Sequence, residues 1–203
     1  YLATTEGALE EVHTILLRIR ELSVQASNGT YTAQDRVALQ AEVTDLQSEI
    51  NRIATDTTFN NIGVLSGAAS TGITFQLGAD NTQTMTVSIP RITISAAGIN
   101  ISTANQLTTA AAAMNYISTI DSAISLISTQ RGTYAAAMNR LDHAIANMQN
   151  VASNLSMAKG RIEDADFAAE TSNLSRVQVL QQASMAMLAQ ANASKQNILS
   201  LFQ

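Results

Sequence analysis

The sequence lacks cysteine and tryptophan and has one proline among its 203 residues. Without cysteine the chain forms no disulfide, iron–sulfur cluster or thiolate zinc site. Charged residues make up only 13% of the chain, and the net charge of −5 comes with no cluster of lysines or arginines. Phosphate neutralisation needs such a cluster, so the composition argues against nucleic-acid binding. No run of 18 apolar residues is present, so no membrane-spanning helix is predicted.

Signatures of catalysis and of metal binding are also scarce. The two histidines, His13 and His143, have no neighbouring histidine or cysteine, whereas a metal site needs several ligands that converge. The acidic residues Glu163, Asp164 and Asp166 lack the glycine and the terminal glutamate of a calcium loop, and we interpret them as a helix cap or a hinge. No nucleophile elbow or glycine-rich phosphate loop occurs. We therefore expect neither an enzyme nor a cofactor.

Glycine and proline divide the chain into helical and non-helical parts. Five of the nine glycines and the single proline lie between residues 58 and 101, and such helix breakers cluster where helices are absent. Within that stretch, apolar and polar residues alternate over 73–77 and over 85–89, on either side of Gly78–Asn81. Alternation with a period of two on both sides of a turn predicts a β-hairpin.

Residues 1–57 are predicted to form two helices. Apolar residues recur at steps of three and four from Ala8 to Ala26 and from Leu39 to Ile53, which is the spacing of one helical face. Between them, Asn28-Gly29 predicts a helix end with a left-handed residue, and Thr32 with Asp35 predicts a capping box for the second helix. Because the link is short, we expect the two helices to be antiparallel neighbours.

A longer helix is predicted within residues 102–160, starting near Ala104 behind a capping box of Thr103 and Gln106. Its apolar seam keeps the same spacing for five heptads and is expected to place Met138 and Met148 in the core. Arg131 alone is polar in this seam, so we expect its stem to pack and its head to reach water or a carboxylate. The seam consists of Ile120, Ile124, Ile127, Arg131, Tyr134, Met138, Leu141, Ile145, Met148, Ala152 and Leu155.

The last segment is apolar and almost uncharged. Between Thr171 and Gln203 the only charged residues are Arg176 and Lys195. Apolar residues fill one helical stripe and also lie off it, so the predicted helix is apolar on several faces. A helix of this kind is buried by something else, and we infer a partner or an assembly.

Several long motifs, which together cover nearly the whole chain, identify a family. The motifs near the start are Thr5–Leu9, Arg18–Ala26, Asn28–Thr30, Glu49–Ile53 and Thr58–Asn60. Those near the end are Arg161–Ala168, Leu180–Ala183, Leu188–Asn192 and Asn197–Leu201. Both sets resemble the motifs of bacterial flagellins.

The resemblance implies a structural subunit of the flagellar filament, secreted to the cell exterior, whose partners are other flagellin subunits. In the family a secretion chaperone holds the C-terminal helix in the cytoplasm before export, and a flagellin-binding assembly factor is a further expected partner. In the filament the terminal helices form the inner tube around the export channel. The residues expected to contact the chaperone or the inner tube are Leu174, Val177, Leu180, Met187, Leu188, Ala191, Ile198, Leu201 and Phe202.

The sequence departs from the family pattern in two places. The inner-tube helix that pairs with the C-terminal helix would precede Tyr1, and we expect such a segment; without it the C-terminal helix needs another cover. The large outer domains are also absent, because Gly63–Gly98 is only a short connector.

The predicted fold is mainly α, an elongated antiparallel helical rod, coiled-coil-like, with a small β-hairpin region and a C-terminal helix. Its parts are rod helices at 1–57, a β-hairpin connector at 58–101, a long rod helix at 102–160, and a hinge with the inner-core helix at 161–203.

The resemblance also places Arg18, Leu22 and Glu42 where receptor-stimulating flagellins contact an innate-immune Toll-like receptor. Arg18 and Leu22 lie one helical turn apart and share a face, and an arginine beside an apolar side chain suits a binding hot spot. Leu17 stands where the family pattern has glutamine. In the competing interpretation, Leu22 is a core residue and Arg18 pairs with Glu42 on a solvated face.

Two other functions compete with a filament subunit. A hook–filament junction protein is a flagellin relative with similar ends, and electron microscopy of long filaments or of short caps at the hook separates the two. An enzyme built on a helical rod is the third hypothesis, and the sequence supplies no site for it.

Overall fold

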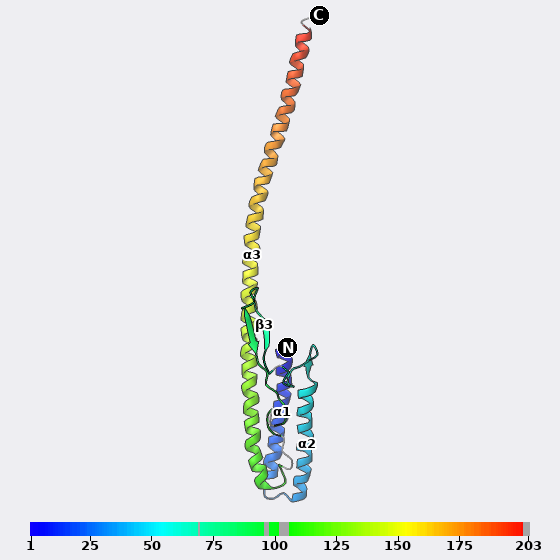
Figure 1. The fold of residues 1–203 in the computed structure, drawn as a ribbon, viewed down its shortest axis with the longest axis vertical. Coiled ribbons are helices and arrows are strands. Elements are labelled where there is room, and N and C mark those ends of the chain that lie inside the picture. Colours follow the sequence, from blue (N-terminus) through cyan, green and yellow to red (C-terminus); the bar gives the residue numbers. More distant parts are fainter. Residues whose placement is uncertain (69, 96–97, 102–105, 201–203) are drawn as a thin grey trace. The chain divides into compact units, whose positions relative to one another are not determined.

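The computed structural model describes residues 1–68, 70–95, 98–101 and 106–200, with the side chains of 164–166 and 195–200 outside the description. Two compact units, Tyr1–Ile145 and Ala146–Gln203, divide the chain. The mainly α content, the small β-hairpin region and the C-terminal helix confirm the predicted fold class (Figure 1). The elements are α1 (Leu2–Ser27), α2 (Ala33–Asp56), β1 (Thr58–Phe59), β2 (Ile62–Gly63), β3 (Ile73–Gln76), β4 (Thr84–Val87) and α3 (Ala110–Ser200).

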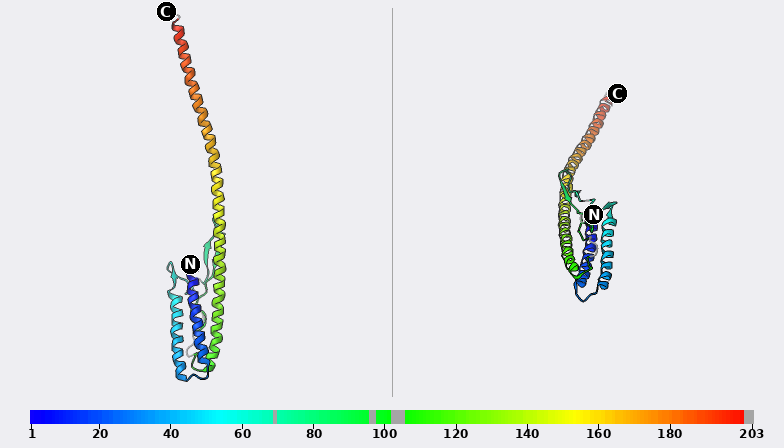
Figure 2. Two further views of the ribbon diagram at one scale, coloured as in Figure 1. Left: turned by 180° about the vertical axis from the view of Figure 1, so that it is seen from behind. Right: turned by 60° about the horizontal axis from the view of Figure 1, so that its bottom comes forward.

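In the first unit, α1 lies between α2 and residues 110–145 of α3 and runs antiparallel to both (Figures 1 and 2). Leu9, Leu16 and Ile19 of α1 are fully buried, so the apolar stripe of this helix faces the core as predicted. Ion pairs of 2.7 Å join the rims of α1 and α3, from Arg20 Nε to Asp121 Oδ1 and from Arg131 Nε to Glu6 Oε1.

The end of α1 differs from the prediction. Asn28 caps the helix with extended backbone angles (φ −69°, ψ 129°), and Gly29 is not among the positive-φ glycines of the described residues. The left-handed termination is therefore wrong. Arg36 of α2 replaces it: its Nε donates to Ala26 O (2.8 Å) and its Nη2 to Asn28 O (3.0 Å). A cation on the last carbonyls of a helix satisfies them and complements the helix dipole.

The start of α2 confirms its predicted capping box. Thr32 Oγ1 accepts a bond from Asp35 N, and Asp35 Oδ2 accepts one from Thr32 N at 2.9 Å. The Thr32 N–H and hydroxyl bond to this carboxylate, and both bonds lower the pKa of Asp35. The capping box thus gives the backbone N–H groups of Thr32 and Asp35 hydrogen-bond partners at the start of α2.

Polar side chains on one face of α2 hold the connector that follows β4. Asn51 Oδ1 accepts from Ile94 N (3.2 Å), Gln47 Nε2 donates to Ile101 O (2.9 Å), and Gln40 Oε1 accepts from Leu107 N (2.8 Å). These backbone groups belong to no helix or sheet, so the side chains supply the partners that buried backbone requires. The connector is thus fixed to α2 without being a strand.

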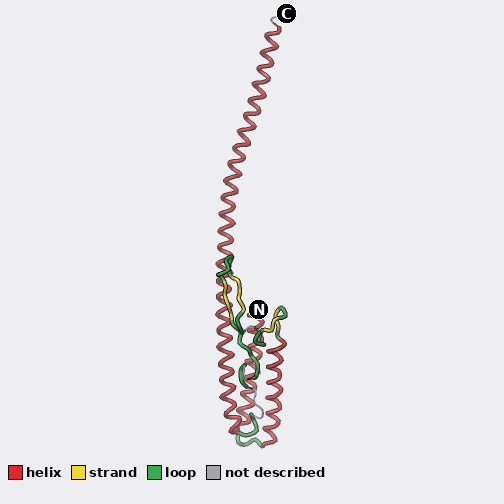
Figure 3. The backbone as a smooth tube through the Cα atoms, viewed as in Figure 1, coloured by secondary structure: helices red, strands yellow, loops and turns green. Residues whose placement is uncertain are grey.

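Two short hairpins carry the β structure (Figure 3). The predicted one is confirmed: β3 pairs antiparallel with β4 in the register Ile73 to Val87. The other was not predicted: in it β1 pairs with β2 through a two-residue turn. Both turn residues, Asn60 and Asn61, have positive φ (49° and 64°), the pattern of a type I′ turn.

The helix α3 starts later than predicted. It begins at Ala110, and Thr109 Oγ1 caps it by accepting from Ala112 N at 3.1 Å. Thr103 of the expected capping box lies outside the described residues. Further on, the helix is continuous through Gly160 and the acidic run at 163–166. The acidic residues therefore do not cap a new helix; the hinge stays a prediction.

The apolar seam of α3 is covered over only part of its predicted length. Within the first unit Ile120, Ile127 and Tyr134 are fully buried, and Met138 and Leu141 pack against the core. Met148 is 41% exposed, so its assignment to the core is wrong, because the repeat continues where no element of its own unit faces it. Arg131 pairs with a carboxylate, as expected of a cation in this seam.

Candidate functional site

The second unit is a single helix, residues 146–200 of α3, with the remaining three residues of the chain outside the description. A lone helix has no second element in its unit against which to bury apolar side chains. None of the side chains described between residues 146 and 194 is buried. Phe167 and Met187 are each 72% exposed, which is unusual for such large apolar groups when they occur together. The exposed large apolar residues here are Met148, Val151, Leu155, Met157, Ile162, Phe167, Leu174, Val177, Val179, Leu180, Met185, Met187 and Leu188.

Six of the predicted contact residues lie on one face of this helix. At 3.6 residues per turn they fall within less than half of its circumference. We name this face the tail stripe: Leu174, Val177, Leu180, Met187, Leu188 and Ala191. All six are exposed. Of Ile198 only the backbone is described, and Leu201 and Phe202 lie outside the described residues.

The tail stripe meets little electrostatic resistance to burial. Arg176 is the one charged residue between Thr171 and Ser194, and the polar groups Thr171 and Ser172 bond back to helix carbonyls at 3.0 Å. Burying a charge is costly unless it is paired, whereas burying an alkyl group is favourable. The helix is therefore suited to packing against other helices.

The predicted receptor residues separate in the structure. Arg18 and Glu42 meet on the surface of α1 and α2, with Arg18 Nη2 2.7 Å from Glu42 Oε1. Hydrogen bonds to Glu42, and then to Glu21, raise the pKa of the Arg18 guanidinium. Leu22 is only 1% exposed and belongs to the core. These contacts match the competing interpretation, in which Leu22 is a core residue and Arg18 pairs with Glu42 on a solvated face. Leu17, next to Arg18 in the sequence, is 42% exposed.

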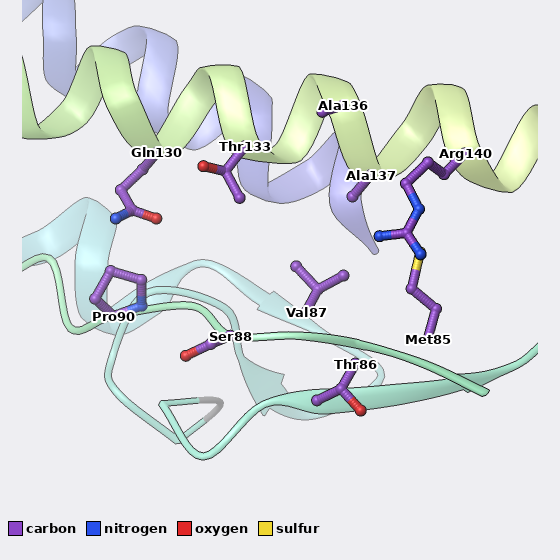
Figure 4. Close-up of a pocket in the computed structure, with 10 residues that line it drawn as sticks. All are labelled: Met85, Thr86, Val87, Ser88, Pro90, Gln130, Thr133, Ala136, Ala137 and Arg140. Atoms are coloured by element: carbon purple, nitrogen blue, oxygen red, sulfur yellow. The ribbon is translucent and has the colours of Figure 1, made fainter. Parts of the chain in front are cut away.

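A groove that was not predicted from the sequence lies between β4 and α3 (Figure 4). It has a volume of about 460 Å³. Val87 points toward the helix, and Thr133 and Ala137 point toward the strand. Arg140 closes one end beside Met85 and has no ion pair within the described residues. The sequence signal was weak, since an arginine next to an apolar helical face is common on any surface helix.

Other kinds of site find no support in the described part of the chain. No group of three or more His, Cys, Asp or Glu among the residues described there could hold a metal ion. None of the helices in the described ranges combines the length and apolar character needed to cross a membrane.

Two family models match the chain. The bacterial flagellin N-terminal helical region matches residues 1–70, and the bacterial flagellin C-terminal helical region matches residues 117–202. The second match includes the whole tail stripe. The first includes α1, α2 and the β1–β2 hairpin.

Known flagellins are similar over almost the whole chain. A flagellin of Halalkalibacterium halodurans is 40% identical over 98% of this chain and 73% of its own length. Flagellin FlaB1 of Treponema pallidum is 37% identical over 100% of this chain and 75% of its own length. The crystal structure of Bacillus cereus flagellin superposes with a TM-score of 0.62 at 35% identity, covering 72% of this chain and 82% of that one. The chain therefore belongs to the bacterial flagellins, structural proteins rather than enzymes, which assemble with one another into the extracellular flagellar filament.

Proposed function

We propose that the tail stripe is the surface by which this flagellin packs into the core of the filament, and that a secretion chaperone holds the same surface in the cytoplasm before export. The observation that carries the proposal is the exposure of large apolar side chains along one face of a helix with few charges. Ile198, Leu201 and Phe202 continue the same spacing in the sequence and are included in the proposed surface.

The energetics favour burial in an assembly. A fully buried Leu, Val or Met side chain contributes about 1.5–3 kcal/mol relative to an exposed one. Several such side chains per subunit, repeated along many subunits, outweigh the entropy lost on association. The first unit buries an apolar core within itself, and its exposed large apolar side chains are sparser along the chain than those of the second unit.

A charge placed in the tail stripe tests the filament role. Leu188→Asp puts a carboxylate where an alkyl group is to be buried, and the desolvation cost should abolish incorporation into filaments. Gln190→Asp is the matched control, because Gln190 lies on the opposite face of the same helix. We expect sedimentation and electron microscopy to show filaments with Gln190→Asp and none with Leu188→Asp. Equal assembly of the two variants contradicts the proposal.

The chaperone role is tested separately with the same pair. Calorimetric titration of the soluble chain with a flagellin export chaperone should give binding that Leu188→Asp weakens at least tenfold and Gln190→Asp leaves within twofold. A fold change of ten corresponds to about 1.4 kcal/mol, less than the burial of one leucine. Unchanged affinity in Leu188→Asp places the chaperone elsewhere, without affecting the filament role.

We also propose that the surface around Arg18 and Glu42 contacts the Toll-like receptor. Support comes from the resemblance and from the exposure of this pair, with the side chain of Leu17 accessible beside it. Leu22 is buried, so it would act by supporting α1 rather than by contact. In a reporter-cell assay Arg18→Ala should reduce signalling, whereas Arg52→Ala, which removes an exposed arginine of α2 paired with Glu49, should not. Equal signalling by both variants contradicts this role. An assembly factor that binds flagellin remains a proposed partner, with no surface assigned to it.

A further inference from the structure

We infer that Asn28–Gly29 is a site of spontaneous deamidation and that the Arg36 side chain slows the reaction by holding the Asn28 carbonyl. This is the only Asn-Gly pair in the sequence. It lies in the α1–α2 link, where Asn28, Gly29 and Thr30 are all exposed to water.

The chemistry needs only the chain and water. The Gly29 backbone nitrogen attacks Asn28 Cγ, a new N–C bond forms, the Cγ–Nδ2 bond breaks, and ammonia leaves with the proton from Gly29 N. Water then opens the resulting five-membered imide at either of its two carbonyls. The products are aspartate or isoaspartate at position 28, with one ammonia released per water consumed. No oxidant, reductant or enzyme takes part.

The local structure makes the pair reactive. Glycine presents no side chain that hinders the attacking nitrogen, and a Cβ built on Gly29 meets no atom within 4 Å, so the link has room to rearrange. Asn28 Oδ1 accepts a bond from Thr30 N at 3.2 Å. That bond keeps the carboxamide beside the backbone that must attack it, and it polarises the Cγ carbonyl.

The same link also restrains the reaction. Attack requires rotation about ψ of Asn28, because at the observed 129° the Gly29 nitrogen is turned away from the side chain. The carbonyl of that peptide unit is held by Arg36 Nη2 at 3.0 Å and by Tyr31 N at 3.3 Å. Arg36 is held in turn by its second bond, to Ala26 O. Charge-assisted hydrogen bonds are the stronger kind, so Arg36 provides the larger part of the restraint.

The reaction would alter the turn that it occurs in. Either product places a new carboxylate at the C-terminal end of α1, where the helix dipole disfavours negative charge, although Arg36 lies beside it. Isoaspartate also adds a backbone atom to the cap. We therefore expect the aged protein to have a looser α1–α2 link.

The test is mass spectrometric peptide mapping of the intact chain after incubation at mildly alkaline pH in ¹⁸O-labelled water. Asn81 is the internal control, since it is exposed in the β3–β4 turn but precedes a β-branched threonine. We expect ¹⁸O incorporation at position 28 well ahead of position 81. Gly29→Ala should suppress it, because a methyl group hinders the nitrogen where the fold has space for it. Reaction at Asn28 no faster than at Asn81 overturns the inference.

Arg36→Ala tests the restraint. Loss of a charge-assisted hydrogen bond should raise the rate at Asn28 by roughly ten- to a hundredfold in the folded chain, with no difference from the original sequence in urea. An equal rate in the folded proteins, or a difference that persists in urea, refutes the role of Arg36. If circular dichroism shows that Arg36→Ala does not fold, Arg36→Lys replaces it. Lysine keeps the charge but cannot bond both carbonyls in the same fork, so a folded Arg36→Lys should still react faster.

Discussion

Two buried tyrosines on α3 differ in what their hydroxyl groups contact. The Tyr116 hydroxyl donates to Ile101 O (3.0 Å) and accepts from Gln47 Nε2 (2.7 Å). The Tyr134 hydroxyl is buried without a hydrogen-bond partner among the described residues, as are Glu6 Oε2 and the Tyr1 hydroxyl. A buried polar group that lacks a partner loses its hydration without compensation. The two residues should therefore respond to the same substitution in opposite ways.

Removing each hydroxyl tests this contrast. Tyr116→Phe should lower the free energy of unfolding by about 1–2 kcal/mol, because Gln47 and Ile101 lose a partner. Tyr134→Phe should leave it unchanged or raise it by up to about 1 kcal/mol, because the hydroxyl group removed is unpaired. Urea unfolding of the two variants measures both values. If Tyr134→Phe is as destabilising as Tyr116→Phe, its hydroxyl has a partner in solution, and a water bound among these buried oxygens would be the first to look for.

The same burial predicts how stability depends on alkaline pH. Burial raises the pKa of Tyr116 from 10.0 to about 12 and raises that of Tyr134 as well, with the phenol of Tyr1 and the carboxylate of Glu6 adding to the second shift. A raised pKa means that the folded state favours the neutral phenol. The stabilising contribution is therefore complete below the unfolded value near 10 and is lost as pH rises toward 12.

Urea unfolding as a function of pH should accordingly show a steep loss of stability above pH 10. Tyr116→Phe should make this loss shallower, because one of the shifted groups is gone. Tyrosinate absorbance followed in parallel should show the ionisation of Tyr116 and Tyr134 delayed until the chain unfolds. A variant whose stability falls with the same slope as the original sequence would contradict the assignment to Tyr116.

Among the short elements, the β1–β2 hairpin contains the clearest local conflict between residue and backbone. Asn60 and Asn61 both adopt the left-handed region, where residues other than glycine are disfavoured by about 1–2 kcal/mol, asparagine least. Asn61→Gly should remove part of that cost and raise the free energy of unfolding by about 0.5–1 kcal/mol.

The control for this prediction places a side chain where the backbone already needs glycine. Gly67 has a φ of 93°, and a Cβ there would lie 3.1 Å from Arg91 Nε, so Gly67→Ala should be destabilising. Thermal unfolding of both variants checks the pair. A stabilising Gly67→Ala, or a destabilising Asn61→Gly, would mean that the backbone of these turns differs from the one described.

Local sequence patterns correctly predicted several helices and one hairpin. The stripes of α1 and α2, the capping box at Thr32, and the alternation around the β3–β4 turn each depend on neighbouring residues. Features without a repeated pattern were not predicted correctly. The β1–β2 hairpin has only two residues per strand, too few for a period, and α1 ends through Arg36, eight residues beyond Asn28.

The candidate site shows the same division. The apolar, weakly charged character of the last helix was predicted from the sequence, because a helical face is a local property, while the contacts of the tail stripe stay a prediction. The covered length of the α3 seam was not predictable, since the repeat runs unchanged from Leu141 to Met148 while burial stops between them. Spacing alone did not show which face of α1 packs against the core. It therefore left open whether Leu22 is buried and whether Arg18 and Glu42 are exposed.

The whole molecule combines a unit that buries an apolar core of its own with a unit that does not. The first unit buries an apolar core and pairs its rim charges. The second presents its large apolar side chains to solvent. In the proposed role of the tail stripe, other helices cover the second unit in the filament, and hydrophobic burial contributes to the free energy of assembly. Assembly should consequently weaken on cooling, as hydrophobic interactions do.

The central claim, that assembly buries the tail stripe, can be measured directly because the chain has no cysteine. A Leu188→Cys variant carries a single thiol at a position that is 63% exposed in the subunit. Its reaction with a maleimide reagent should be fast in the soluble chain and slow by at least tenfold in filaments formed with other flagellin subunits. A Thr82→Cys variant, exposed in the β3–β4 turn, calibrates the reactivity of an accessible thiol in each state. If the thiol at position 188 reacts as fast in the filament as in the soluble chain, the tail stripe is not an assembly surface.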